Sequence, residues 1–324
     1  MPGFNFTKPG QVTKQQYEDI LTEFFRIAPL PSTIYYRDPS IEETIIKSCL
    51  SHGLDKEVTI KAAKAGAATA HWFYPLHKKE VQLAIGLFTA FCIEVEDLGD
   101  ICVEEIRSFR ENMILGKPQL PLLQSCAALP SLFDQHYNKF SADKITTGLI
   151  GFMGSCVLEF EGSDFGALES SPKFPNYFRV MTGLAEPYTF FTLQKDFFTP
   201  ETLKLLIQAA PDIMDYTDHV NDLLSFYKES IVSDDRNNYI YQQAIAQRTT
   251  VHEVLWNLVR QIMGYIDNIN RTISTNPTLC KFIDAYLRGF IGFHMDIPRY
   301  RLSELDIPEL AGKCFFLGTF TLRG

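Results

Sequence analysis

The sequence has 324 residues, of which 46% are hydrophobic and 21% are charged. These proportions are ordinary for a globular protein and exclude an intrinsically disordered chain, so we expect a sizeable core. The formal net charge of −9 argues against nonspecific binding to nucleic acid or to an anionic membrane, and a polyanionic substrate would need help from a metal ion or from local arginines.

The seven cysteines are odd in number and scattered, and they form no C-x-x-C pair. This usage predicts reduced thiols in a cytoplasmic protein. Residues 1–10 contain Pro, Gly and Asn instead of a charged segment followed by an apolar one, and no apolar run reaches about 18 residues. We therefore expect neither a secretion signal nor a stable membrane anchor.

Helical periodicity dominates the hydrophobic pattern. Apolar residues recur at helical spacing, as at Val81, Ile85 and Phe88, whereas alternating strand patterns are scarce. Proline marks the breaks, and at Thr199-Pro200 the threonine can cap a helix that the proline opens. The pattern predicts an all-α protein.

Three predicted helices carry most of the polar motifs, at about 79–103, 212–230 and 276–295. The polar segment 230–238 is expected to be a loop that can order on binding. No internal repeat and no flexible linker is visible, so we expect one domain over residues 1–324.

The first motif is acidic and ends the predicted helix 79–103. It places Glu94, Glu96, Asp97 and Asp100 at a helix C-terminus, where the helix dipole disfavours carboxylates by a few tenths of a kcal/mol or more. Such a cluster requires a compensating cation, and Mg²⁺ would supply one. The alternative is an acidic surface loop, which is the commoner meaning of an isolated cluster.

The second motif lies on the predicted helix 212–230. Asn221, Ser225 and Glu229 follow one another at four-residue steps, so an amide oxygen, a hydroxyl and a carboxylate share one helical face. This all-oxygen set suits Mg²⁺, which is bound largely through substrate phosphates. Lys228 could reach a phosphate oxygen as a point charge. A solvated helix face with these residues present by chance is the alternative.

Together the two motifs resemble a known family. The pattern Asn221-Asp222-x-x-Ser225-x-x-x-Glu229 resembles the second metal-binding motif of class I terpene cyclases. The version with Phe-Tyr-Lys-Glu is similar to the fungal trichodiene synthase family, and the acidic cluster lies upstream by about that family's interval.

The resemblance also gives the acidic residues roles. Glu96 takes the position of the family's first metal-binding aspartate, Asp97 follows it and Asp100 closes the motif. Glutamate departs from the aspartate-rich pattern and is one methylene longer. The sequence therefore leaves open whether Glu96 or a neighbouring carboxylate is the metal ligand.

Two further segments extend the resemblance. Arg179 falls where the family keeps its diphosphate-sensing arginine, with Thr182 and Gly183 at the linked effector positions on a helix break. Arg299 and Tyr300 resemble the family's Arg-Tyr pair, which binds diphosphate when the site closes. A guanidinium can bind phosphate oxygens bidentately, so these assignments agree with the chemistry.

Aromatic rings would stabilise a carbocation, each by about 0.5 to 2 kcal/mol. The chain contains 26 Phe, 14 Tyr and 2 Trp. Candidates for the cavity wall are Phe88 and Phe91, shortly before the acidic motif, Phe152, within the small-residue segment 148–155, and Phe293, before the Arg-Tyr pair. For any single aromatic residue, a place in the core is the commoner alternative.

The resemblance implies a single-domain antiparallel helical bundle around a deep central cavity, and a homodimer. It also implies farnesyl diphosphate as substrate, three Mg²⁺ ions, and a cyclic sesquiterpene or sesquiterpene alcohol as product. Composition and spacing alone predict only a helical, metal-using diphosphate enzyme. A chain-elongating prenyltransferase would be expected to carry two aspartate-rich motifs. A catalytically silent prenyl-diphosphate-binding protein also stays open, because of Glu96.

Overall fold

The computed structural model describes residues 10–32, 35–98, 101–161 and 165–310, and within them all regular secondary structure is helical. The α-helices are α1 (Lys14–Ile27), α2 (Pro39–Leu50), α3 (Lys56–Phe73), α4 (Lys79–Leu98), α5 (Val103–Leu115), α6 (Pro121–His136), α7 (Lys139–Phe160), α8 (Phe174–Thr182), α9 (Ala185–Phe191), α10 (Pro200–Phe226), α11 (Tyr239–Gln247), α12 (Val251–Ile273) and α13 (Pro277–Asp296). Shorter turns are η1 (Lys195–Phe197), the π-helical η2 (Tyr227–Val232), η3 (Pro298–Tyr300), η4 (Leu302–Glu304) and η5 (Pro308–Leu310). The all-α prediction is confirmed.

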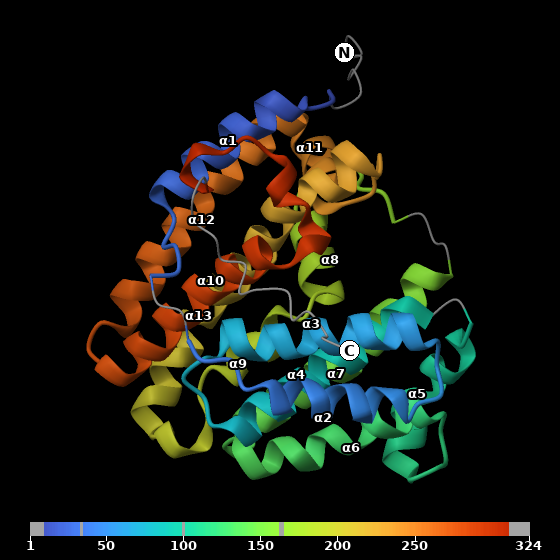
Figure 1. The fold of residues 1–324 in the computed structure, drawn as a ribbon. Helices are drawn as coiled ribbons and strands as arrows, with labels where there is room; N and C mark the ends of the chain where they lie inside the picture. The colour runs from blue at the N-terminus through green and yellow to red at the C-terminus, as the bar shows by residue number, and fades with distance from the viewer. Residues whose placement is uncertain (1–9, 33–34, 99–100, 162–164, 311–324) are drawn as a thin grey trace, which may run out of the picture.

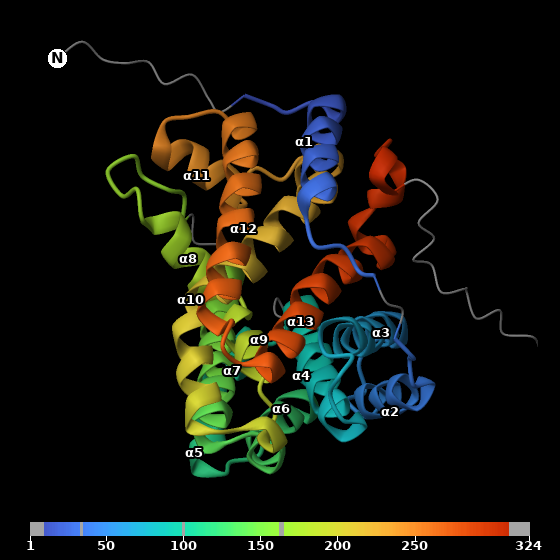
Figure 2. The same cartoon turned by 90° about the vertical axis from the view of Figure 1, so that its left-hand side faces the viewer.

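The helices form two groups with α13 between them (Figures 1 and 2). On one side α2, α3 and α4 pack together, and on the other α10 packs along α12. Helix α13 contacts α3 on its first side and both α10 and α12 on its second. None of the described helices combines the length and the apolarity needed to cross a membrane.

Helix α10 is longer than predicted. It begins at Pro200, where Thr199 accepts a hydrogen bond from the backbone of Thr202 as the N-cap, and it runs through Pro211. The helix start expected at Thr199-Pro200 is confirmed, but the helix expected from about residue 212 is the continuation of the same helix, because Pro211 does not break it. Pro211 and Ile207 are both exposed, so water can bind the Ile207 carbonyl that the proline leaves without its helical partner.

Helix α4 is shorter than predicted. It ends at Leu98, and α5 begins at Val103, so the expected single helix 79–103 is wrong at its end. The last turn of α4 carries acidic residues and no basic one, which the helix dipole disfavours. The other predicted segments are closer: α13 agrees with 276–295 to within one residue, and the loop expected at 230–238 begins after η2 ends at Val232.

Helices α13 and α3 meet at a glycine. A Cβ atom added at Gly289 would lie 1.7 Å from the carbonyl oxygen of Trp72, far inside van der Waals contact. The Trp72 indole also donates to Asp296, with Nε1 3.0 Å from Oδ2. The same tryptophan therefore contacts α13 at two positions, Gly289 and Asp296. Only glycine allows this close approach.

We expect Gly289→Ala to lower the free energy of unfolding by about 3 kcal/mol, because the added methyl group must push two backbones apart. Gly264→Ala on α12 is the matched control, since nothing lies within 4 Å of its Cβ position. That control should raise stability by about 0.5 to 1 kcal/mol, as alanine does in an open helix. Urea unfolding of both variants measures the difference, and equal stabilities would contradict the close packing.

Candidate functional site

The acidic end of α4 points its carboxylates in two directions. Residues two apart on an α-helix lie about 200° apart around its axis, so Glu94 and Glu96 occupy opposite faces. Glu94 is fully buried, with Oε2 2.8 Å from Nδ1 of His52, whose Nε2 lies 3.0 Å from Oγ of Ser125. Glu94 therefore anchors α4 in the core and takes no part in an acidic cluster.

Glu96 and Asp97 instead lie on the exposed side of the helix, while Asp100 is outside the described residues. Desolvation raises the pKa of Glu96, and Arg299 lowers it, with smaller effects of the same sign from Lys228 and Arg179. The Glu96 residue is nevertheless exposed to water, so it lies at the protein surface, where neighbouring atoms desolvate its carboxylate only in part. Glu96 thus lies close to basic residues from α8, η2 and η3.

Replacement by glutamine should change the free energy of unfolding differently at these two glutamates. Glu94→Gln is expected to lower the free energy of unfolding by about 1.5 to 3 kcal/mol, because it disrupts the buried hydrogen bond between Glu94 and His52. Glu96→Gln should leave that free energy within about 0.5 kcal/mol or raise it, since burial already disfavours the Glu96 charge. Urea unfolding at neutral pH measures both. A larger loss at Glu96 than at Glu94 would contradict the two orientations.

Arg179 on α8 is held by α10. Its Nε lies 2.8 Å from Oδ1 of Asp222, its Nη1 lies 3.1 Å from Oδ1 of Asp218, and its Nη2 lies 3.3 Å from Oδ1 of Asn221. Only a fifth of the Arg179 side chain is exposed. The guanidinium is therefore fixed in orientation before any ligand binds.

The helix break after α8 packs against this arginine. A Cβ at Gly183 would lie 2.8 Å from Nη1 of Arg179 and 2.9 Å from Oδ1 of Asp218, so a side chain there would displace the ion pair. The Gly183 N–H donates to the Arg179 carbonyl, and the Thr182 hydroxyl donates to the Phe178 carbonyl at 3.1 Å. Gly183 therefore lies against the Arg179 guanidinium, while the effector roles of Thr182 and Gly183 stay a prediction.

Asp218 was not among the predicted site residues. Burial raises the pKa of Asp218 to about 7 and that of Asp222 to about 6, and Arg179 opposes both shifts. The Oδ2 atom of each has no hydrogen-bond partner among the described residues. Their four-residue spacing on α10 was the available signal, since it places both carboxylates on one helical face.

The Asn221, Ser225 and Glu229 side chains span the end of α10 and the turn that follows. Ser225 is buried, whereas Asn221 and Glu229 are half-buried. Glu229 lies on the π-helical η2, whose turn is wider than that of an α-helix, so its side chain is displaced from the α-helical position. Lys228 Nζ lies 3.1 Å from Oε1 of Glu229. Glu229 is also close enough to Arg179 to act on its charge.

These oxygens fit Mg²⁺. Within the described part of the chain, no group of three or more His, Cys, Asp or Glu side chains forms a complete metal cage. An amide, a hydroxyl and a single carboxylate are instead the hard donors that Mg²⁺ accepts when substrate phosphates and water complete its shell.

Tyr300 and Arg299 approach the same place from η3. The Tyr300 ring centroid lies 5.8 Å from Lys228 Nζ and 4.3 Å from the His294 ring centroid. Burial raises the pKa of Tyr300 to about 12, which Arg299 opposes and the nearby carboxylates of Glu229 and Glu96 increase. The hydroxyl is thus a hydrogen-bond donor at neutral pH. Exposed Arg299 has no ion pair within 4 Å among the described residues, so it can bind an anion.

The predicted aromatic residues are divided by the structure. Phe293 lies beside the site, with its ring centroid 5.9 Å from that of Tyr300. Phe88 is fully buried and packs on Phe191 at 5.2 Å, and Phe91 packs edge-on to His52 at 5.0 Å. Phe152 is buried on α7. Which rings line a cavity stays a prediction.

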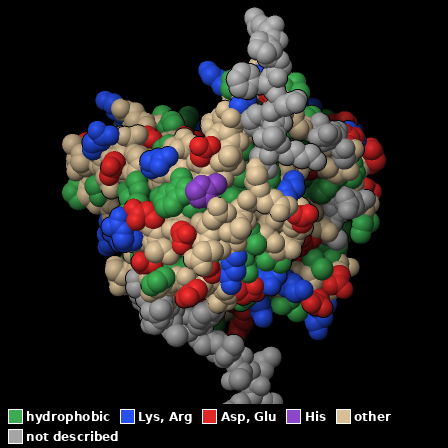
Figure 3. All heavy atoms as spheres, turned by 90° about the horizontal axis from the view of Figure 1, so that it is seen from above, with side chains coloured by type: hydrophobic (Ala, Val, Ile, Leu, Met, Phe, Trp, Pro, Cys, Tyr) green, Lys and Arg blue, Asp and Glu red, His purple; other side chains and the backbone are tan. Residues whose placement is uncertain are grey.

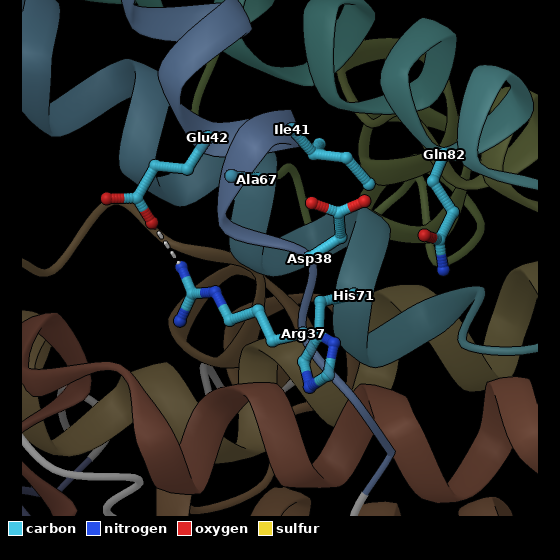
Figure 4. A pocket seen from close by; sticks show the side chains of 7 residues that line it. All are labelled: Arg37, Asp38, Ile41, Glu42, Ala67, His71 and Gln82. Carbon is cyan, nitrogen blue, oxygen red and sulfur yellow. Dashed lines mark hydrogen bonds and ion pairs between the residues drawn. The ribbon is translucent and has the colours of Figure 1, made fainter.

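Two surface features lie outside this site. On the face in Figure 3, basic side chains are interspersed with acidic ones. A small pocket between α2, α3 and α4 is lined by Arg37, His71 and Gln82 among others (Figure 4). It holds about 10 Å³, which is room for one water molecule and too little for a substrate.

Known proteins similar to this chain match it over most of its length. The family described as Trichodiene synthase (TRI5) matches residues 56–309. An (E)-beta farnesene synthase of Metarhizium brunneum is 33% identical over 92% of this chain and 92% of its own length. An alpha-cuprenene synthase of Coprinopsis cinerea is 26% identical over 90% of each chain. In the solved structures, a linalool/nerolidol synthase of Streptomyces clavuligerus in complex with 2-fluorogeranyl diphosphate superposes with a TM-score of 0.63 over 83% of this chain and 97% of its own, which at 12% identity shows the class I terpene synthase fold.

Proposed function

Since this chain belongs to the trichodiene synthase family, we propose that it is a Mg²⁺-dependent sesquiterpene synthase. It would ionise farnesyl diphosphate, cyclise the carbocation and release diphosphate, as a carbon-oxygen lyase acting on phosphates. The observation that carries the proposal is the convergence of Glu96, Arg179, Glu229 and Tyr300, from four separate segments, on one place. The names of the two relatives above agree with a C15 substrate.

The proposed metal ligands come from two parts of the chain. Asn221 and Ser225 of α10, with Glu229 of η2, would hold Mg²⁺, and so would Glu96 and Asp97 of α4. Three ions are proposed, on the family resemblance. When bound, they neutralise the negative charge of the diphosphate and make it a better leaving group.

The basic residues and Tyr300 would bind the diphosphate directly. Arg179 presents N–H groups already oriented by Asp222 and Asp218, so little reorganisation accompanies binding. Lys228 and Arg299 would add positive charge, and the Tyr300 hydroxyl would donate a hydrogen bond. These basic residues lie near the carboxylates of Glu96 and Glu229, so positive charge for the diphosphate and carboxylates for the metal would share one site.

The carbocation would then need a dry and aromatic interior. The ring centroids of Phe293 and Phe73 lie 5.1 Å apart and those of Phe73 and Tyr188 lie 5.6 Å apart, so a series of edge-on ring contacts continues from Tyr300 through Phe293. Ring faces stabilise positive charge, and exclusion of water prevents early quenching. Proton loss or addition of one water would end the reaction as a hydrocarbon or an alcohol.

We further propose that the protein is a cytoplasmic homodimer of single-domain protomers, with the family resemblance as its support. Neither nucleic acid nor a membrane is a proposed partner.

Incubation with farnesyl diphosphate, with and without Mg²⁺, followed by gas chromatography and mass detection of the extract, tests the function. A C15 terpene formed only with the metal is the expected result. Activity with geranyl or geranylgeranyl diphosphate alone would correct the substrate. Joining of farnesyl and isopentenyl diphosphates would indicate a chain-elongating prenyltransferase. Binding without turnover of all three would contradict the proposal in favour of a silent binding protein.

A further inference from the structure

His294 on α13 is a buried histidine with both ring nitrogens hydrogen-bonded. Its Nδ1 lies 2.8 Å from the carbonyl oxygen of Phe290, one helical turn earlier. A carbonyl oxygen only accepts hydrogen bonds, so Nδ1 carries the hydrogen. With the hydrogen on Nδ1, the other nitrogen of the neutral ring, Nε2, is an acceptor.

That acceptor faces the first residue of the α10 motif. His294 Nε2 lies 3.1 Å from Nδ2 of Asn221, whose amide must therefore direct its nitrogen toward α13. On the other side of the same amide, Oδ1 lies 3.3 Å from Nη2 of Arg179, and an arginine only donates. Two independent partners thus require the same orientation of the Asn221 amide.

This orientation matters because only the amide oxygen can bind Mg²⁺. With its nitrogen held by His294, Asn221 presents Oδ1 on the side of Arg179, where the remaining site residues converge. The opposite rotamer would present an N–H group, which repels a cation.

The same imidazole also packs on the diphosphate-binding side. Its ring centroid is 4.3 Å from that of Tyr300, so the two rings are in close contact. His294 is therefore in contact with one residue of the proposed metal site and with one residue of the proposed diphosphate site.

We propose that His294 is a positioning residue that fixes the Asn221 amide oxygen toward the metal and seats Tyr300 beside it. The inference rests on the proposed function, because it assigns His294 to the same site. Outer partners of metal ligands typically change metal affinity by about 10- to 100-fold when removed.

The test measures the rise in melting temperature that Mg²⁺ with inorganic diphosphate produces in the purified protein, as a function of Mg²⁺ concentration. His294→Phe keeps a ring against Tyr300 but removes the acceptor, and it should raise the half-saturating Mg²⁺ concentration at least 10-fold. His294→Gln, whose side-chain amide reaches the place of Nε2, should recover most of that loss. His71→Phe changes a buried histidine on α3 and should have no effect.

If His294→Phe does not fold, His294→Asn takes its place, because asparagine can still donate to Phe290 but is too short to reach Asn221. Equal half-saturation in wild type and in the variant that lacks the acceptor would overturn the inference, and so would a glutamine variant as weak as that variant. If the wild type itself gains no stability from Mg²⁺ and diphosphate, the proposed function fails instead.

Discussion

Arg179→Lys is expected to lower the rate of diphosphate release by about 10²- to 10³-fold, the usual effect of removing one oriented donor from a charged transition state. Lysine keeps the positive charge but has no planar fork, so it cannot hold Asp222, Asp218 and a phosphate group at once. The Michaelis constant should change less than kcat, because the lost interaction strengthens as the C–O bond breaks. Steady-state kinetics of diphosphate release measure both constants.

Arg288→Lys is the matched control, because Arg288 pairs with Asp284 on α13 and with the Leu30 carbonyl, away from the site. It should leave kcat unchanged. A melting temperature for Arg179→Lys near that of the wild type would show that the fold is intact. Normal diphosphate release by such a folded variant would remove Arg179 from the site.

Glu229→Gln is expected to have the second large effect. It removes one negative charge from the α10 motif at nearly constant volume, so the Mg²⁺ concentration for half-maximal activity should rise at least 10-fold. The rate at saturating Mg²⁺ should fall by about 10²-fold, because the metal ions would orient the diphosphate less firmly. A Mg²⁺ titration of diphosphate release measures both quantities.

Glu111→Gln is its matched control, because Glu111 is exposed on α5 and forms an ordinary surface pair with Lys117. Such pairs contribute about 0 to 1 kcal/mol, so this variant should titrate like the wild type. An unchanged Mg²⁺ requirement in Glu229→Gln would exclude Glu229 as a ligand.

The fold could be predicted from the sequence wherever local pattern decides it. Helical periodicity gives the all-α class and the extent of α13, and the Thr199-Pro200 cap marks where α10 begins. The end of α4 and the passage of α10 through Pro211 could not be predicted in this way. The end of α4 depends on which of its carboxylates form hydrogen bonds or ion pairs. The continuation of α10 depends on whether Pro211 lies on the solvent-exposed side of the helix.

The candidate site shows the same division. The four-residue spacing predicts that Asn221, Ser225 and Glu229 belong together, and the family resemblance adds Arg179 and Tyr300. No local pattern predicts the burial of Glu94 against a histidine 42 residues away. The contact between Asn221 and His294, 73 residues apart, is equally hidden in the sequence. These contacts arise when α4 meets the α2–α3 connection and when α13 packs on α10, so they require the tertiary structure.

We propose that these residues together form one Mg²⁺-dependent site for ionising a prenyl diphosphate. The most direct measurement is the initial rate of diphosphate release from farnesyl diphosphate, with Mg²⁺ and with the metal removed by a chelator, alongside the amount of C15 product. Diphosphate should be released only with Mg²⁺, release should return when the metal is added back, and one diphosphate should form for each C15 terpene. Equal release with the chelator present, or no release at any Mg²⁺ concentration by protein that binds the substrate, would contradict the proposal.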